Sequence, residues 1–351
     1  MDFTFNDDQL MFRDSVKAFL TNEMTPEHIR SLWDTDSGRS PEFWPKLAEL
    51  GLTAMTVPEQ YGGLGMNALD FVLLAQECGY AAMPGVLVET ALVAIPLIAE
   101  LDDAHEGFKQ DWLPQIAEGS ARVAVAHPDN LLVADAHMAD LLLLAHNGEV
   151  HGVPAVDVTL EANPSVDPSR RLFSVQWTPS DATKLADAET GALLWQNAFN
   201  RGALGVAAQQ LGLAKRMMDV TVDYTYERKQ FGKPVGSFQA VKHMMADVAV
   251  KVEFARPPLI KAAYDIANGE ASAALAVSHA KLVASEAVRA AAKNGIQAHG
   301  AMGYTWEVDL QIFMKAGWAM DASYGDQGTH KVRIKSAILA EGAALGAGAS
   351  F

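Results

Sequence analysis

The residues with the most reactive side chains are few and scattered along the sequence. The single cysteine, Cys78, has no candidate base near it in the chain, so we do not expect it to act as a nucleophile. The glycine-rich turn at 62–65 is not followed by the Lys-Ser/Thr pair that a phosphate-binding loop needs. Metal-ligand spacing is missing among the four histidines of the C-terminal half, His243, His279, His299 and His330. We therefore expect no metal site.

The composition argues against several classes of protein. The 351 residues include 27 Lys and Arg against 43 Asp and Glu, which gives a formal net charge of −16. This charge disfavours binding to nucleic acid and to an anionic membrane surface. We find no uncharged apolar run long enough to span a membrane, and no signal peptide at the N-terminus. Because there is one cysteine, an intramolecular disulfide is impossible, and a cytoplasmic protein is the expectation.

Helical periodicity runs through residues 1–118, which we predict to be an N-terminal helical domain. One apolar stripe has the spacing i, i+4, i+7 and i+8, formed by Phe12, Val16, Phe19 and Leu20. Acidic residues precede this stripe, where carboxylates favour the helix dipole. Further helices are expected at 67–79, 86–99 and 108–118, and the turn-forming run 57–65 separates the early helices from the later ones.

The pattern changes twice after this point. Residues 119–186 contain short apolar or alternating runs at 122–126, 141–145, 150–158 and 172–177, punctuated by turn formers, which predict a shortened middle β domain. Residues 187–351 return to long, alanine-rich helical patterns and predict a C-terminal helical bundle. The fold class is therefore mainly α with an inserted β domain, and we expect the C-terminal domain to carry an oligomer interface.

Four segments, taken in order, resemble the acyl-CoA dehydrogenase family. They are PEQYGGLG at 58–65, FKQDWLPQIAEGSARVAVA at 108–126, YTYERKQFGKPVGSFQAVKHMMAD at 224–247, and IQAHGAMGYTWE at 296–307. The third segment is the most specific, and the β domain is the weakest part of the match. Together the segments cover nearly the whole chain, in the order and spacing of the family.

The resemblance implies a flavin enzyme that contains FAD. The family oxidises an acyl-CoA thioester to its trans-2-enoyl product. A glutamate removes the α-proton, and hydrogen bonds to the thioester carbonyl acidify the α-carbon. The flavin is the hydride acceptor, while the protein positions it and supplies the base.

The resemblance also implies that this chain has one half of a shared FAD site. In the family, the adenine and pyrophosphate side comes from the C-terminal helices of one subunit. The matching positions here are Arg228, Phe231, Gln297, Gly300 and Ala301, where Ala301 replaces a usual glycine. A guanidinium pairs well with phosphate oxygens, and small residues let the backbone approach. The alternative is that Arg228 is a surface cation and Phe231 a core residue.

The flavin-ring side of the site, in contrast, looks absent from the sequence. The family's β domain carries a TEPxAGSD-like loop and an NGxKxWIT-like strand. The corresponding stretches here are AHPDNLLVADAH at 126–137 and HNGEVHGVPAVDV at 146–158, and neither contains tryptophan. Trp177 is the only tryptophan of the β region and is expected on a strand face. The alternative is a divergent sequence that preserves the backbone contacts.

The catalytic base also looks absent. One family position lies in an EGT turn, which reads YGDQGT here, so that Gln327, Gly325 or Asp326 takes the place of the glutamate. The alternate position aligns with Gly202, followed by Ala203 where an arginine is usual. An amide or a hydrogen atom cannot accept a proton, so neither replacement can be a general base. Asp326 is the only carboxylate nearby, and we expect it to be a solvated turn residue.

Half a cofactor site without a base indicates a division of labour between two chains. Some members of the family are α2β2 heterotetramers in which a homologous partner brings the glutamate, and such enzymes shorten bulky, steroid-derived acyl-CoA side chains in lipid degradation. The sequence resembles the subunit that lacks the base. Two alternatives remain: a self-sufficient homotetrameric acyl-CoA dehydrogenase with an atypical base, and a flavin-free structural paralogue.

Overall fold

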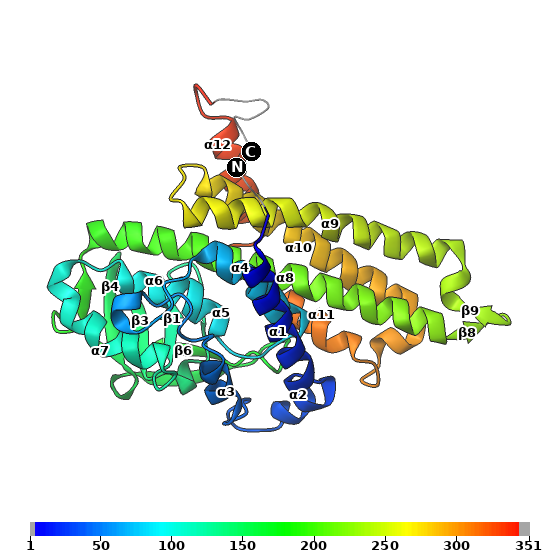
Figure 1. Cartoon of the computed structure of the whole chain (residues 1–351), viewed down its shortest axis with the longest axis horizontal. Helices are drawn as coiled ribbons and strands as arrows, with labels where there is room; N and C mark the ends of the chain where they lie inside the picture. The colour runs from blue at the N-terminus through cyan, green and yellow to red at the C-terminus, as the bar shows by residue number, and fades with distance from the viewer. Residues whose placement is uncertain (1–3, 344–351) are drawn as a thin grey trace. The chain divides into compact units, whose positions relative to one another are not determined.

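The computed structural model describes residues 4–343, which separate into two compact units (Figure 1). Within the described range, the first unit comprises residues up to Pro26, then Val72–Met83, then everything from Val206 onward. The second unit comprises Glu27–Phe71 and Pro84–Gly205. The chain is helical as far as α7, forms strands from β1 to β7, and is again mainly helical from α8. The fold class predicted from the sequence is therefore confirmed, whereas the boundaries at 118/119 and 186/187 stay predictions.

The first unit is built from long helices. Its elements are α1 (Asp7–Glu23), most of α4 (Ala68–Tyr80), the later part of α8 (Ala188–Glu227), the short strands β8 (Lys229–Gln230) and β9 (Lys233–Pro234), η6 (Val235–Ser237), α9 (Gln239–Ala267), α10 (Ala273–His299), η7 (Gly300–Tyr304), α11 (Leu310–Met320) and α12 (Gln327–Ile338). A capping box begins α1, because Asn6 and Gln9 exchange side-chain to backbone hydrogen bonds of 2.8 and 2.9 Å.

Helices α9 and α10 run side by side along this unit (Figure 1). The buried residues of α9 recur at helical spacing, as in Met245, Val248 and Val252, and they face a buried stripe of α10 that is mostly alanine. Small side chains allow the two helices to pack closely. At another crossing in this unit, a Cβ added to Gly212 of α8 would lie 2.0 Å from the carbonyl oxygen of Gln76 on α4, so that position requires glycine.

From residue 202 to residue 214, the apolar surface of α8 is covered within the single chain. Every residue from 202 to 214 is buried, including Leu204 and Leu211 at 0% exposure. One reason to expect an oligomer interface on the C-terminal domain is that residues 203–222 are apolar on most sides of a helix. The chain itself buries this helix as far as residue 214, so that stretch gives no argument for a partner. The large apolar residues that remain exposed in this unit include Val222 (45%) and Tyr226 (77%) on α8 itself and Phe254 (76%) on α9.

The second unit combines short helices with a small β region. Its elements are α2 (Pro26–Trp33), α3 (Phe43–Glu49), η1 (Glu59–Tyr61), α5 (Leu87–Glu89), the π-helix η2 (Thr90–Ala94), α6 (Ile95–Ala99), η3 (Asp103–His105), α7 (Glu106–Ala117), β1 (Val123–Ala126), β2 (Val133–Ala134), η4 (Ala136–Met138), β3 (Leu141–His146), β4 (Glu149–Pro154), η5 (Ala155–Asp157), β5 (Thr159–Asn163), β6 (Leu172–Gln176), β7 (Lys184–Ala186) and the start of α8.

The strands form a four-stranded sheet in the order β1-β3-β4-β7 and a three-stranded sheet in the order β2-β6-β5. Strand β3 is central and buried on both faces from Leu141 to Leu144, which explains its continuous apolar sequence. It pairs in parallel with β1 and antiparallel with β4. Asn147 and Gly148 connect β3 to β4 with φ values of 50° and 86°, as a two-residue type I′ hairpin requires.

Candidate functional site

The predicted phosphate-contact segment is a short hairpin at the end of α8. Arg228 directly follows this helix; its backbone N–H donates to the carbonyl of Tyr224 at 2.9 Å, and its own carbonyl accepts from Val235 at 2.7 Å. Strands β8 and β9 pair around a tip formed by Phe231 and Gly232, both at positive φ (53° and 77°). Phe231 is 91% exposed. The alternative that this phenylalanine belongs to the core is therefore wrong.

A second predicted segment lies at the end of α10, and the structure brings it beside the first. The ring of Tyr224 stacks on the ring of His299, with centroids 4.1 Å apart and an interplanar angle of 19°. The hydroxyl of Tyr224 also donates to the carbonyl oxygen of His299 at 3.4 Å. His299 is immediately followed by Gly300, and Arg228 lies one helical turn beyond Tyr224. The two motifs that are far apart in sequence therefore meet at one end of the helical unit.

The geometry of the second segment suits a close backbone approach. Gly300 has φ 62° and ψ −137°, a conformation that L-residues rarely adopt, and a Cβ added there would meet nothing within 4 Å. Ala301 and Gln297 are both exposed, so their polar backbone and amide groups are accessible. Burial lowers the pKa of His299, so its imidazole is neutral at pH 7 and serves as a packing surface for Tyr224.

These residues fit the diphosphate half of FAD in chemistry and exposure. Across the described part of the chain, the guanidinium of exposed Arg228 makes no hydrogen bond or ion pair, so its N–H donors are available to a ligand. A planar guanidinium recognises phosphate oxygens bidentately. Together with the neighbouring exposed Gln297 and Gly300, Arg228 provides donors on two elements that a diphosphate could bridge. Their role as cofactor ligands stays a prediction.

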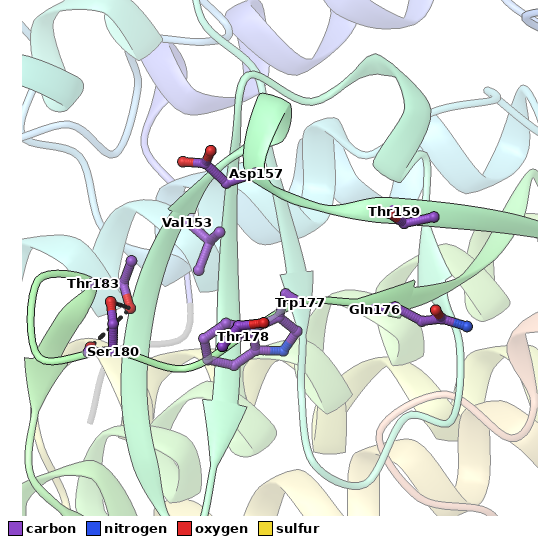
Figure 2. A pocket seen from close by; sticks show the side chains of 8 residues that line it. All are labelled: Val153, Asp157, Thr159, Gln176, Trp177, Thr178, Ser180 and Thr183. Carbon is purple, nitrogen blue, oxygen red and sulfur yellow. Dashed lines mark hydrogen bonds between the residues drawn. The ribbon is translucent and has the colours of Figure 1, made fainter.

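The middle β region has a shallow, polar cavity of about 520 Å³ beside Trp177 (Figure 2). Its lining residues are Val153, Asp157, Thr159, Gln176, Trp177, Thr178, Ser180 and Thr183. Trp177 lies one residue beyond the end of β6, so the expectation that it is on a strand face was wrong. Its indole packs against the buried residues of the β sheets and makes an edge contact with His151 at 4.9 Å between centroids. None of these contacts tests the flavin-ring side of the site, so the loss of that side stays a prediction.

Asp326, the carboxylate within the stretch that aligns with the first base position, is a helix cap. Its Oδ1 atom accepts hydrogen bonds from the backbone N–H of Thr329 at 2.8 Å and from the Thr329 hydroxyl at 2.9 Å. These bonds begin α12 and stabilise the charged carboxylate, so they lower the pKa of Asp326. A carboxylate that is held in its charged form by a cap is a weak proton acceptor.

The other residues at this position face the interior of the helical unit. The amide nitrogen of Gln327 donates to the hydroxyl of Ser285 at 3.0 Å, and Ser285 is 1% exposed. Gly325 has φ 87°, and its carbonyl oxygen accepts from the Nζ atom of buried Lys281 at 3.2 Å. The segment is therefore fixed by interior hydrogen bonds, and neither residue offers a group that accepts a proton.

This segment is anchored by a buried polar network that we did not anticipate from the sequence. The carboxylate of Asp321 accepts hydrogen bonds from Ser285, from Arg289 at 2.8 Å and from Gln210 at 3.3 Å, while Lys281 donates to the Asp321 carbonyl at 2.9 Å. Lys281, Ser285 and Arg289 are spaced by four residues on α10, so they lie on one face of that helix. A polar stripe with this spacing in an alanine-rich helix was the available signal.

The alternate base position, Gly202, is a buried residue of α8 without a side chain. Ala203, where the family usually has an arginine, is 0% exposed. The nearest arginine in sequence, Arg201, pairs with Glu100, to which Asn197 also donates at 3.3 Å. Arg201, two residues before Ala203, is therefore engaged in an ion pair of its own.

Two searches of the described residues were negative. In residues 4–343, no group of three or more His, Cys, Asp and Glu side chains is arranged to hold a metal ion. Of the helices described, none is both long enough and apolar enough to cross a membrane.

Comparison with known proteins identifies the family. The model of the acyl-CoA dehydrogenase N-terminal domain matches residues 6–120, and that of the C-terminal domain matches residues 189–339. Acyl-CoA dehydrogenase IpdE2 of Mycolicibacterium smegmatis is 33% identical over 317 residues, which cover 88% of this chain and 92% of the relative.

Two solved structures share the fold. A chain of the ChsE4-ChsE5 complex from Mycobacterium tuberculosis superposes with a TM-score of 0.84 at 22% identity, covering 96% of this chain and 99% of that chain. A chain of the Tcur3481-Tcur3483 steroid ACAD G363A variant superposes with a TM-score of 0.83 at 24% identity, covering 97% and 99%. From the two matched domains and the 33% identical relative together, the chain belongs to the acyl-CoA dehydrogenase family.

Proposed function

We propose that this chain is the subunit of a heteromeric, FAD-dependent acyl-CoA dehydrogenase that does not contain the catalytic base. It would supply the adenine and diphosphate side of a shared FAD site, and a homologous partner chain would supply the glutamate. An α2β2 assembly is the expected form. The observation that carries the proposal is the contrast between the exposed Arg228 hairpin and base positions that hold a glycine, an amide donor and a carboxylate engaged as a helix cap.

The residues at the base positions support the proposal that this chain does not remove the α-proton. Gly202 has no side chain, Gln327 donates its amide to a buried serine, and Asp326 is a charged helix cap. General-base catalysis requires an acceptor whose pKa lies near the operating pH and which can reach the substrate. The partner's glutamate would therefore remove the α-proton of the thioester.

The exposed end of the helical unit supports the cofactor role. Arg228 would hold the diphosphate through charge-assisted hydrogen bonds, and Gly300 would let the backbone N–H groups approach it. When FAD is bound, it supplies the hydride acceptor for the β-carbon of the substrate. The contribution of this chain would be to bind and orient the cofactor for the partner's site.

The proposed substrate class is based on the family and on two solved structures with a similar fold. The family acts on acyl-CoA thioesters, and we propose an acyl-CoA substrate with a bulky, steroid-derived acyl group. Support comes from the similarity in fold to a protein described as a steroid ACAD and to a chain from a complex of two differently named subunits. The assembled enzyme, rather than this chain alone, would select the particular acyl-CoA.

Co-expression with a candidate homologous partner chain tests the proposal. The expected result is little flavin absorbance when this chain is purified alone, and bound FAD in a complex of both chains. A yellow, active protein from this chain alone would instead indicate a self-sufficient homotetramer. A complex that stays colourless and inactive after incubation with FAD would indicate a flavin-free structural paralogue.

A further inference from the structure

The polar cavity beside Trp177 is the feature of the second unit that the proposed function leaves unexplained. Its volume of about 520 Å³ lies within the range of roughly 300–1,000 Å³ that is typical of sites for small molecules. Four of its lining side chains are exposed and make no hydrogen bond or ion pair with any residue in the described part of the chain: Asp157, Thr159, Gln176 and Thr178. Their donors and acceptors are therefore available to a ligand.

One wall of the cavity is held by hydrogen bonds that reach the interior. The Oγ1 atom of Thr183 lies 3.0 Å from Nδ1 of His151 and 3.3 Å from the hydroxyl of Ser180 (Figure 2). The other ring nitrogen of His151 lies 3.2 Å from the carboxylate of Glu149, and His151 itself is 1% exposed. The buried imidazole therefore fixes the hydroxyl of Thr183, and through it that of Ser180, before any ligand arrives. Such preorganisation reduces the entropy lost on binding.

The apolar part of the lining consists of the indole of Trp177 and the side chain of Val153. Edge contacts with His146 and His151, at 6.2 and 4.9 Å between ring centroids, restrain the indole. Carbon atoms of a ligand that lie against these two side chains would be removed from water, which is favourable. A suitable ligand therefore combines an apolar surface with several hydrogen-bonding groups.

The lining disfavours an anionic ligand. It contains no lysine or arginine among the described residues that form it, so a phosphate or carboxylate would meet no cation. Lys184 follows Thr183 in the chain, but its Nζ atom is already within 3.2 Å of Asp181 and 3.6 Å of Glu149. The one carboxylate of the lining, Asp157, would repel an anion as well.

A compact cation is also a poor match. Figure 2 shows Asp157 and Trp177 on different sides of the cavity, with Val153 between them, so a small ammonium group could not contact both the carboxylate and the indole. Hydroxyl groups suit the lining better because each of them can both donate and accept. They can donate to the Asp157 carboxylate and to the side-chain oxygen of Gln176, and they can accept from the nitrogen of that amide.

We propose that this cavity binds a neutral polyhydroxylated molecule, of the class of monosaccharides and cyclic polyols. Its hydroxyl groups would bond to Asp157, to Gln176 and to the fixed hydroxyl of Ser180, while its carbon atoms lie against Trp177. The lining residues all belong to the second unit, so the site needs neither FAD nor a partner chain.

A ligand-observed NMR titration of the purified full-length chain tests the site with D-glucose, D-galactose, D-mannose and myo-inositol. We expect saturable binding of at least one of them, with a Kd on the order of 1 mM, and no saturable binding of choline or D-glucose 6-phosphate. Asp157→Ala and Gln176→Ala each remove one hydrogen-bonding group and should weaken binding about two- to tenfold. The double variant should weaken it about four- to hundredfold, since independent effects multiply.

Asp181→Ala is the matched control, because the Asp181 side chain is fully exposed and is not part of the lining, and it should leave binding unchanged. Thermal unfolding of each variant verifies that the fold is retained, as expected for substitutions at exposed positions. If none of the four polyols binds saturably below about 50 mM, the proposal is overturned. Equal binding by the parent and the double variant overturns it too, because the ligand would then lie elsewhere. Tighter binding of choline or D-glucose 6-phosphate that the double variant abolishes would show that the cavity selects a charged ligand instead.

Discussion

The role of Asp326 can be tested by two substitutions that separate its charge from its hydrogen bonds. As the cap of α12, Asp326 accepts from the backbone N–H and the hydroxyl of Thr329. Asparagine is as good an N-cap as aspartate, so Asp326→Asn should leave the free energy of unfolding almost unchanged. Asp326→Ala removes the acceptor and should cost about 0.5–2 kcal/mol of stability. Its pKa is already lowered, so the native residue is charged throughout neutral pH.

The expected effect on turnover is small for both variants. A general base contributes roughly 10²–10⁴-fold to rate, and Asp326→Asn removes the charge that a base would need. If the carboxylate only caps α12, steady-state turnover of the co-expressed complex with an acyl-CoA substrate should stay within about threefold of the parent.

Urea unfolding of each variant gives the stability comparison, and flavin absorbance verifies that FAD is retained. A loss of two or more orders of magnitude in Asp326→Asn, with FAD bound and stability unchanged, would refute the reasoning. The chain would then contain its own base. Gln327→Ala is a second probe of the same turn. Its turnover should also stay within about threefold of the parent, because the amide of Gln327 has no proton-accepting role.

Three further outcomes follow from the contacts. Arg228→Ala should weaken FAD binding to the complex about tenfold or more, measured by dialysis, and unchanged flavin content would argue against Arg228 as a ligand. Asp321→Ala leaves buried donors without an acceptor and should lower stability by about 3–5 kcal/mol in urea unfolding, whereas Arg289→Gln, with its side chain 52% exposed, should lower it by about 1 kcal/mol or less. Burial lowers the pKa of His330 to about 4, below the ~6.5 of an unfolded chain, so the unfolded state binds its proton first as the pH falls. The free energy of unfolding should therefore fall by up to about 3 kcal/mol between pH 6.5 and 4. His330→Asn should remove this contribution to the pH dependence.

Local signals in the sequence predicted the secondary-structure elements well where a single local feature, such as a turn, determines them. The turn formers between the runs at 141–145 and 150–158 were expected to separate two strands, and in the structure Asn147 and Gly148 join β3 to β4 in a hairpin. The run at 150–158 was predicted as one strand, but β4 ends at Pro154 and a short 3₁₀ turn follows, because proline cannot continue the ladder. Strand β5 was not predicted at all. Its five residues from Thr159 to Asn163 do alternate between polar and apolar, but Leu160 and Ala162 are the only apolar ones, so the signal is too short to stand out.

Contacts between distant segments were beyond the reach of sequence periodicity. The motifs around Arg228 and Gly300 could be found from the resemblance, but the ring stack that joins them depends on how α8 and α10 cross. The network around Asp321 likewise draws its members from several helices, and only its stripe on α10 has a regular spacing. The burial of α8 was misjudged for the same reason: composition shows that a helix must be covered, but not whether its own chain covers it.

The rate at which trypsin cleaves the hairpin at the end of α8 can report on assembly of the protein. Trypsin cleaves after Arg228 and Lys229, which lie on exposed backbone beside the Phe231 tip, whereas Pro234 blocks cleavage after Lys233. An isolated chain should therefore be nicked at one narrow place, leaving two large fragments that stay associated through their buried helices. Occupation of this end by cofactor and partner would slow that cut, so the digestion rate measures assembly without any assay of turnover.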